Sequence, residues 1–201
     1  MKFDLHTHHF RCGHADGNIR DYVEAALDAG FQVIGISDHT PYFGEKEDRA
    51  FPRIAMGKSE LQHYVREVLD LKKEYEGRID VLLGIESDFF PEHTETYRKV
   101  LADVPFDYII GSVHSVGGVS IFNKNRWKGL SERERIRVKE EYYQLIQDSA
   151  RSGMFQILGH IDAMKGNFAA FSDIPADEII DETLQTIAEY GIAIEINTSG
   201  K

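Results

Sequence analysis

The sequence of 201 residues predicts an α/β fold in which parallel strands close into a barrel. Two observations support this fold class. Short apolar runs alternate six times with amphipathic helical segments, the pattern of buried parallel strands joined by helices. Five of the six runs also carry histidine or glutamate near their ends. Such even use of strand ends favours a barrel over a doubly wound sheet, because all loops that follow barrel strands meet on one face.

Local signals place the elements in order along the chain. Ser59 with Gln62 forms a predicted capping box that opens one helix, and Ser131 with Glu134 opens a longer one. Glycines mark most of the helix ends, and Pro175 precedes the last helix. The predicted strands are 3–8, 31–37, 79–85, 106–113, 155–158 and 192–197. The predicted helices are 18–29, 59–77, 94–102, 131–153 and one after Pro175.

Composition predicts one globular domain over residues 1–201 with a substantial core, since 42% of the residues are hydrophobic. No run is apolar for long enough to span a membrane, and the chain opens without the apolar segment of a secretory signal. The single cysteine, Cys12, agrees with a reducing compartment, so we expect a cytoplasmic protein. A formal charge of -11 argues against a nucleic-acid partner, which needs clustered Lys and Arg.

Imidazole and carboxylate side chains gather at the predicted strand ends. Asp4, His6 and His8 alternate along the first strand, so all three should point to one side and His9 to the other. An isolated histidine is more often structural than a ligand, but this many at strand ends favour a metal site. The candidate metal ligands are His6, His8, His14, His39, Glu86, His114 and His160.

The donor set indicates both the metal and the chemistry. Imidazole and carboxylate without thiolate favour Zn, Mn or Fe, and the number of ligands predicts two to three divalent ions. A centre of several ions clamps a phosphoryl group and activates water, so phosphoester hydrolysis is the predicted reaction class. Asp4, Asp38 and Asp162 lie beside ligands and could orient their imidazoles, although each could equally be an ordinary loop carboxylate.

Seven short motifs follow one another along essentially the whole chain. They resemble, in the same order, the successive motifs of the PHP (polymerase and histidinol phosphatase) superfamily, and most closely those of its monofunctional histidinol-phosphate phosphatases. The motifs are Asp4-Leu-His-Thr-His8, Cys12-Gly-His14-Ala, Ser37-Asp-His39, Gly84-Ile-Glu86-Ser-Asp88-Phe, Gly111-Ser-Val-His114, Gly159-His160-Ile-Asp162 and Asn197-Thr-Ser-Gly200.

The resemblance implies a distorted (β/α)7 TIM-like barrel, the PHP fold, with a trinuclear metal site. A metal-bound hydroxide held by His6, His8 and Glu86 would attack phosphorus in L-histidinol phosphate. The products would be L-histidinol and phosphate, in histidine biosynthesis. Three ligand sets are implied, with Glu86 bridging: His6, His8 and Glu86; His14 and His39; and Glu86, His114 and His160.

Two long loops, residues 40–58 and 115–130, would supply the substrate contacts. Both carry basic and aromatic side chains that could meet a phosphate or an imidazole. The candidate substrate-binding residues are Arg49, Arg53 and Arg126 in these loops, and Lys165, which lies just past a later strand end. For each of them, the alternative is a solvated surface charge.

The resemblance is incomplete at the C-terminal end. The family carries a further Asp and His on a seventh strand, and the sequence stops at Lys201, after the sixth. Either the sequence is a fragment whose barrel lacks its last βα portion, or the barrel closes in another way. We expect a fragment, because a protein that ended after the sixth strand would expose unpaired backbone at an open edge. A polypeptide ending here should retain metal mainly at Glu86, His114 and His160 and show little turnover.

Two other functions remain open on the sequence. Another PHP phosphoesterase, acting on a nucleotide or other small phosphate, would use the same metals. A non-catalytic metal-binding module would keep the ligands for structural reasons. In that case His114→Ala would lower the melting temperature without abolishing any hydrolysis. The sequence predicts neither the oligomeric state nor which metal is bound.

Overall fold

The computed structural model describes residues 1–51 and 54–197, so Arg53 and residues 198–201 lie outside the described residues. The chain divides into two compact units, Met1–Ile110 and Gly111–Lys201, and each is described by itself. Parallel strands alternating with helices confirm the α/β class. Closure into a distorted barrel, and a single domain over the whole chain, stay predictions.

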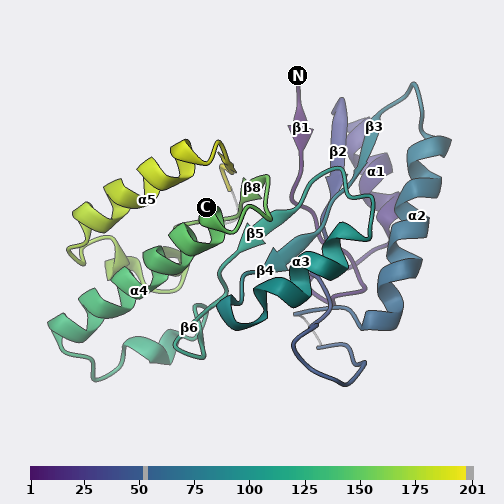
Figure 1. The fold of residues 1–201 in the computed structure, drawn as a ribbon. Coiled ribbons are helices and arrows are strands. Elements are labelled where there is room, and N and C mark those ends of the chain that lie inside the picture. The colour runs from purple at the N-terminus through teal and green to yellow at the C-terminus, as the bar shows by residue number, and fades with distance from the viewer. Residues whose placement is uncertain (52–53, 198–201) are drawn as a thin grey trace. The chain divides into compact units, whose positions relative to one another are not determined.

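Three parallel strands form the first sheet. β1 (Phe3–Asp4) pairs with β2 (Val33–Ile36), which pairs in turn with β3 (Asp80–Leu83). α1 (Ile19–Asp28) and α2 (Leu61–Glu74) connect these strands and pack beside the sheet (Figure 1). Parallel strands need such crossover connections, which the alternating pattern of the sequence predicts.

Shorter elements complete the first unit. β4 (Glu86–Asp88) follows β3 after Gly84 and Ile85, and η1 (Lys58–Glu60) precedes α2. η2 (Pro91–His93) leads into α3 (Thr94–Ala102), whose bounds are those predicted. The capping box predicted at Ser59 is wrong, because α2 begins only at Leu61. The Ser59 amide instead donates to the Asp48 carboxylate, at 3.1 Å.

The strands are shorter than the apolar runs that predict them. The apolar pattern reports burial, and burial continues past the last residue that is paired as a regular strand. β1 ends at Asp4, whose carboxylate accepts a hydrogen bond from the backbone of His6 at 2.9 Å. His6 and His8 therefore follow the strand, and the predicted alternation of Asp4, His6 and His8 along it is wrong.

One tyrosine ring fills the space over two glycines of the first unit. A Cβ atom on Gly35 would lie 2.1 Å from the Tyr108 hydroxyl oxygen, and one on Gly84 would lie 2.2 Å from Cζ of the same ring. The Tyr108 hydroxyl donates to the carbonyl of Leu5 at 2.6 Å. The glycines at the ends of two strands thus admit a ring that contacts the segment before His6.

The second unit combines a short parallel sheet with two long helices. β5 (Ile110–Ser112), β8 (Ile157–Leu158) and β9 (Ala193–Ile194) lie side by side in that order. α4 (Glu132–Arg151) and α5 (Asp177–Glu189) pack against each other (Figure 1).

The capping box predicted at Ser131 and Glu134 is present at the start of α4. No helix in the described part of the chain is both long and apolar enough to cross a membrane.

The connections of the second unit carry short elements of their own. β6 (Ser115–Val116) and β7 (Val119–Ser120) form an antiparallel hairpin in the loop predicted to contact substrate. Three 3-10 turns complete the unit: η3 (Lys124–Trp127), η4 (Ala163–Gly166) and η5 (Ala169–Phe171).

Gly84→Ala should destabilise the protein by about 1–3 kcal/mol, because a new methyl group would overlap the Tyr108 ring. Urea unfolding measures the loss. Gly166→Ala is the control, since a Cβ atom there meets nothing within 4 Å, and should change stability by less than about 0.5 kcal/mol. Equal stability of the two variants would show that the ring does not pack tightly over Gly84.

Candidate metal centre

Three imidazole nitrogens surround one carboxylate oxygen in the first unit. Nε2 of His6 and Nε2 of His8 each lie 3.3 Å from Oε2 of Glu86, and Nδ1 of His39 lies 2.9 Å from it. Glu86 is buried, with 1% of its surface exposed. The donors come from three separate segments, as expected where strand ends meet.

Backbone hydrogen bonds beyond the regular strands hold these segments together. The Ser37 amide donates to the Thr7 carbonyl at 3.1 Å, and the Glu86 amide donates to the Asp38 carbonyl at 3.1 Å. The Thr40 amide returns to the Glu86 carbonyl at 2.9 Å. The spacing of the ligands is therefore set by main-chain pairing.

A second pair of imidazoles adjoins the first group. Nδ1 of His14 lies 3.0 Å from Nε2 of His39, and the two rings are stacked. His39 therefore faces Glu86 with one nitrogen and His14 with the other. His14 comes from the exposed loop before α1, so of these donors it is the one most open to solvent.

The donors fit a divalent cation. Four ligands around zinc, at nitrogen distances of about 2.0–2.1 Å, lie about 3.3 Å apart. Nε2 of His6 and Nε2 of His8 are separated by 3.2 Å. Burial lowers the pKa of His8 below its ordinary value and so favours the neutral ring that binds metal. Burial also raises the pKa of Cys12 to about 12, which leaves a protonated thiol and an imidazole and carboxylate donor set.

Asp38 lies behind the cluster and contacts two adjacent histidines. Its Oδ1 lies 3.4 Å from Nδ1 of His8, and its Oδ2 lies 2.5 Å from Nδ1 of His9. Burial by itself would raise the pKa of Asp38, but contacts with His8 and His9 outweigh it and hold the pKa well below its usual range. As an ionised carboxylate, Asp38 can only accept hydrogen bonds, so Nδ1 of His8 carries the hydrogen.

This protonation leaves the lone pair of His8 Nε2 facing Glu86. A neutral imidazole lone pair and a carboxylate oxygen at 3.3 Å repel each other unless a cation lies between them. The pairing of Asp38 with His8 is therefore the arrangement expected for a metal-binding imidazole, whose other nitrogen donates to a carboxylate.

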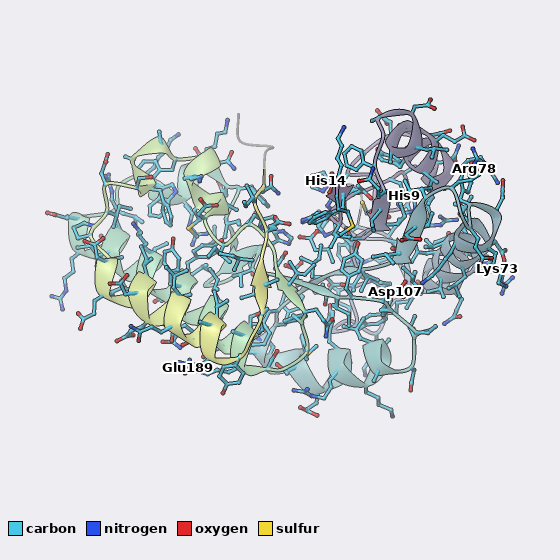
Figure 2. The ribbon with its side chains drawn as sticks, turned by 90° about the horizontal axis from the view of Figure 1, so that it is seen from above. His9, His14, Lys73, Arg78, Asp107 and Glu189 are labelled. Carbon is cyan, nitrogen blue, oxygen red and sulfur yellow. The ribbon has the colours of Figure 1, made fainter. Side chains whose placement is uncertain are left out.

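Sequence reasoning missed His9. The alternation expected of a strand placed its side chain on the opposite side from His8. Because the regular strand ends at Asp4, both rings instead reach Asp38, and His9 is 1% exposed. Figure 2 labels His9 and His14 among the side chains of the first unit. The sequence did contain a signal for this role, because His9 directly follows the last histidine of the His-x-His motif.

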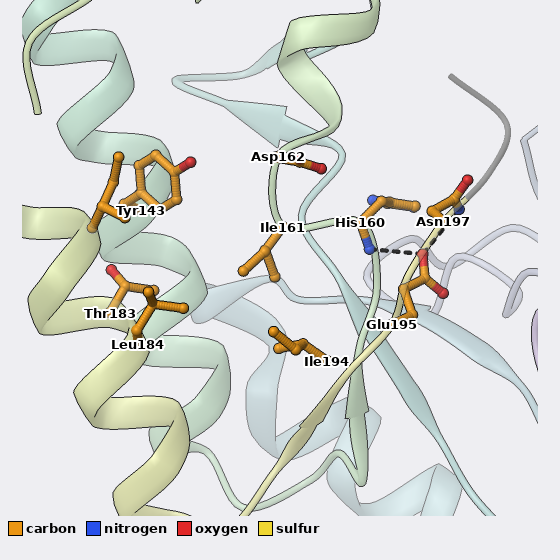
Figure 3. Close-up of a pocket in the computed structure, with 10 residues that line it drawn as sticks. Tyr143, His160, Ile161, Asp162, Thr183, Leu184, Ile194, Glu195 and Asn197 are labelled. Atoms are coloured by element: carbon orange, nitrogen blue, oxygen red, sulfur yellow. Dashed lines mark hydrogen bonds between the residues drawn. The ribbon is translucent and has the colours of Figure 1, made fainter. Parts of the chain in front are cut away.

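The second unit brings two further candidate ligands together. Nε2 of His114 lies 3.2 Å from Nε2 of His160. His160 has a positive φ of 23°, a conformation that residues other than glycine rarely adopt. Glu195 accepts from its amide at 2.8 Å (Figure 3). The Tyr142 hydroxyl donates to its carbonyl at 3.2 Å. These bonds hold the strained backbone, and sequence reasoning identified neither partner.

A cavity of about 240 Å³ lies beside His160 in the second unit (Figure 3). It is lined by α4, α5 and β9, and Asp162 and Glu195 stand at its edge. The Asp162 carboxylate pairs with the ammonium of Lys165. The structure thus places both predicted residues in one surface ion pair.

The other predicted substrate residues have different surroundings. Arg49 is exposed and pairs with Glu45 at 3.0 Å. The Arg126 guanidinium donates to the carbonyls of Val119 at 2.8 Å and Val116 at 3.1 Å, which ties it to the hairpin. Arg53 lies outside the described residues. A role for any of them in substrate binding stays a prediction.

Comparison with known proteins agrees with this geometry. The model of the PHP domain family matches residues 4–199. A probable histidinol-phosphatase of Deinococcus radiodurans is 35% identical, over 98% of this chain and 73% of its own length. The histidinol-phosphatase of Bacillus subtilis is 29% identical, over 100% of this chain and 81% of its own.

A solved structure has the same fold. The crystal structure of the histidinol phosphate phosphatase of Lactococcus lactis contains zinc, L-histidinol and phosphate. It matches 98% of this chain and 73% of that chain with a TM-score of 0.80, at 22% identity.

Glu86→Gln should weaken zinc binding by at least about tenfold, because the amide removes a buried charge from the centre of the cluster. Competition with a chelating dye measures the affinity. The control is Glu95→Gln, which changes an exposed glutamate that pairs with Arg98 on α3. If both variants bind zinc as tightly as the unmodified protein, Glu86 is not a ligand.

Proposed function

Because the chain belongs to the PHP domain family, we propose that it is a metal-dependent phosphomonoesterase acting on L-histidinol phosphate. The products would be L-histidinol and phosphate, in histidine biosynthesis. One observation carries the proposal: three imidazole nitrogens lie within 3.3 Å of one buried carboxylate oxygen. The relatives named histidinol-phosphatase support the substrate, as does the Lactococcus structure with zinc, L-histidinol and phosphate.

The donors would hold two to three divalent ions, Zn, Mn or Fe. When bound, such ions lower the pKa of coordinated water toward neutrality and neutralise the charge on a phosphoryl group. Glu86 would bridge them. In the first unit the ligands would be His6, His8, His14, His39 and Glu86, and in the second unit His114 and His160.

Charge explains why cations belong in this chemistry. The chain carries a formal charge of -11, and the cluster contains the buried carboxylates Glu86 and Asp38. A phosphate dianion is repelled by both unless positive charge is supplied locally. An imidazole that binds metal is neutral and brings none, so bound ions would provide the attraction. Two further carboxylates would hold ligands in place: Asp38 positions His8, and Glu195 holds the strained backbone of His160.

Basic side chains would supplement the ions. Arg49 pairs only weakly with exposed carboxylates in water, so a phosphate could displace them. Arg126 and Lys165 would first have to leave the partners described above, and Arg53 remains a candidate from sequence alone. From the acidic charge we further propose that the ligand is a small phosphate ester and not nucleic acid. The single cysteine supports the cytoplasm as the location.

The zinc- or manganese-loaded protein should release phosphate from L-histidinol phosphate faster than from other phosphate monoesters, including nucleoside monophosphates. Phosphate release is measured together with chromatographic detection of L-histidinol. Glu86→Gln should reduce the rate to that of metal-stripped protein, while Glu95→Gln should not change it.

Two outcomes would contradict the proposal. Preference for a nucleotide or another monoester would indicate a different PHP phosphoesterase. If the metal-loaded protein hydrolyses none of the esters, and His114→Ala lowers only the melting temperature, the protein is a non-catalytic metal-binding module.

A further inference from the structure

A chain of buried contacts runs from Arg11 to the metal cluster in the first unit. Nη1 of Arg11 lies 3.2 Å from Nε2 of His9, and Nδ1 of His9 lies 2.5 Å from Oδ2 of Asp38. The other oxygen of Asp38 lies 3.4 Å from Nδ1 of His8. His8 then faces Glu86 with Nε2, at 3.3 Å.

The chemistry of the two ends decides where each hydrogen sits. A guanidinium can only donate, so Nε2 of His9 is the acceptor and its hydrogen sits on Nδ1, toward Asp38. An ionised carboxylate can only accept, so Nδ1 of His8 also carries its hydrogen. Nδ1 of His8 and Nδ1 of His9 are buried and form no hydrogen bond of regular geometry among the described residues, so the Asp38 carboxylate is their close polar neighbour. One set of hydrogen positions therefore turns a donor toward an acceptor in each of these contacts.

Arg11 is itself held in place by two glutamates. Its Nη2 lies 2.6 Å from Oε2 of Glu67 on α2, and its Nε lies 3.2 Å from Oε2 of Glu60 in η1. The Arg11 side chain is 10% exposed, against 48% for Glu60 and 32% for Glu67. The loop after β1 is thereby fastened to the helix that covers the sheet.

We propose that Arg11 is a positioning residue that selects, through His9 and Asp38, the imidazole tautomer in which His8 binds metal with Nε2. The inference rests on the metal-binding part of the proposed function and is independent of the substrate. Asp38 by itself already favours hydrogen on Nδ1 of His9, but without the Arg11 donor the form with hydrogen on Nε2 is no longer excluded. In the Nε2–H form, Nδ1 of His9 presents a lone pair to the Asp38 carboxylate. The two groups then repel each other, and Asp38 is held less firmly against Nδ1 of His8.

Arg11→Met should weaken zinc affinity about tenfold, the lower end of the range for residues that orient metal ligands. Zinc affinity of the metal-stripped full chain is measured by competition with a chelator. The matched control is Arg20→Met. Arg20 also fastens a helix through paired contacts with Glu74, at 2.5 and 2.6 Å, but does not touch His9 or Asp38. Its loss should leave zinc affinity within about twofold of the unmodified protein.

A second variant background distinguishes selection of the His9 tautomer by Arg11 from a role in which Arg11 only anchors the loop. In His9→Asn the side-chain amide can donate to Asp38 from near the position of Nδ1, and an amide has no ring tautomer to select. R11M should therefore cost about tenfold in zinc affinity with His9 present, and less than about twofold in the H9N background. Equal losses in both backgrounds would overturn the proposal in favour of a merely structural role.

The hydrogen positions can be read directly in the metal-free protein by two-dimensional 1H–15N spectra of the imidazoles. The expected result is hydrogen on Nδ1 in both His8 and His9, with a mixture in His9 of R11M. Hydrogen on Nε2 of His9 in the unmodified protein would overturn the proposal even if R11M failed to fold. Neither readout uses a phosphate ester, so an incorrect substrate assignment would leave these tests unaffected.

Discussion

Main-chain pairing beyond the ends of the regular strands is the constraint on which the rest of the first unit depends. Hydrogen bonds from Ser37 to Thr7 and from Glu86 to Asp38 keep three segments at the spacing of neighbouring strands, about 4.8 Å. That spacing is short enough for imidazoles on two segments to reach a carboxylate on the third. The donor cluster is thus a consequence of sheet geometry, which the side chains then refine.

Sequence reasoning succeeded where the signal was local. The bounds of α3 and the capping box of α4 depend on residues within one or two helical turns, and both were predicted correctly. It failed where a distant group competes for the same atoms. The Ser59 amide is taken by Asp48, eleven residues away, so the expected cap does not form. The regular strand likewise ends at Asp4, where the carboxylate accepts from the backbone of His6, and His9 then contacts Asp38, which strand alternation does not predict.

The candidate site shows the same contrast between residues placed by local signals and residues placed by distant contacts. Short imidazole and carboxylate side chains close to strand ends have few places to go, and the structure brings the predicted donors together within each unit. Long basic side chains choose their partners by loop conformation, which apolar periodicity does not report. Arg126 bonds to the backbone of the hairpin and Lys165 pairs with Asp162, three residues away. The family resemblance implied the candidate ligands, but it contained no information on these contacts.

The Tyr108 ring links three positions that lie far apart in the sequence. A Cβ atom on Gly35 or Gly84 would overlap the ring, and on Gly35 it would also lie 3.0 Å from the Cα of Leu5. Substitutions at the three residues are therefore coupled. A relative could acquire alanine at either glycine only after, or together with, a smaller residue at the tyrosine. That smaller residue would also give up the hydrogen bond to Leu5 just ahead of His6. Amino-acid substitution at these interior positions is therefore restricted by the need to hold the segment that carries His6, a candidate metal ligand.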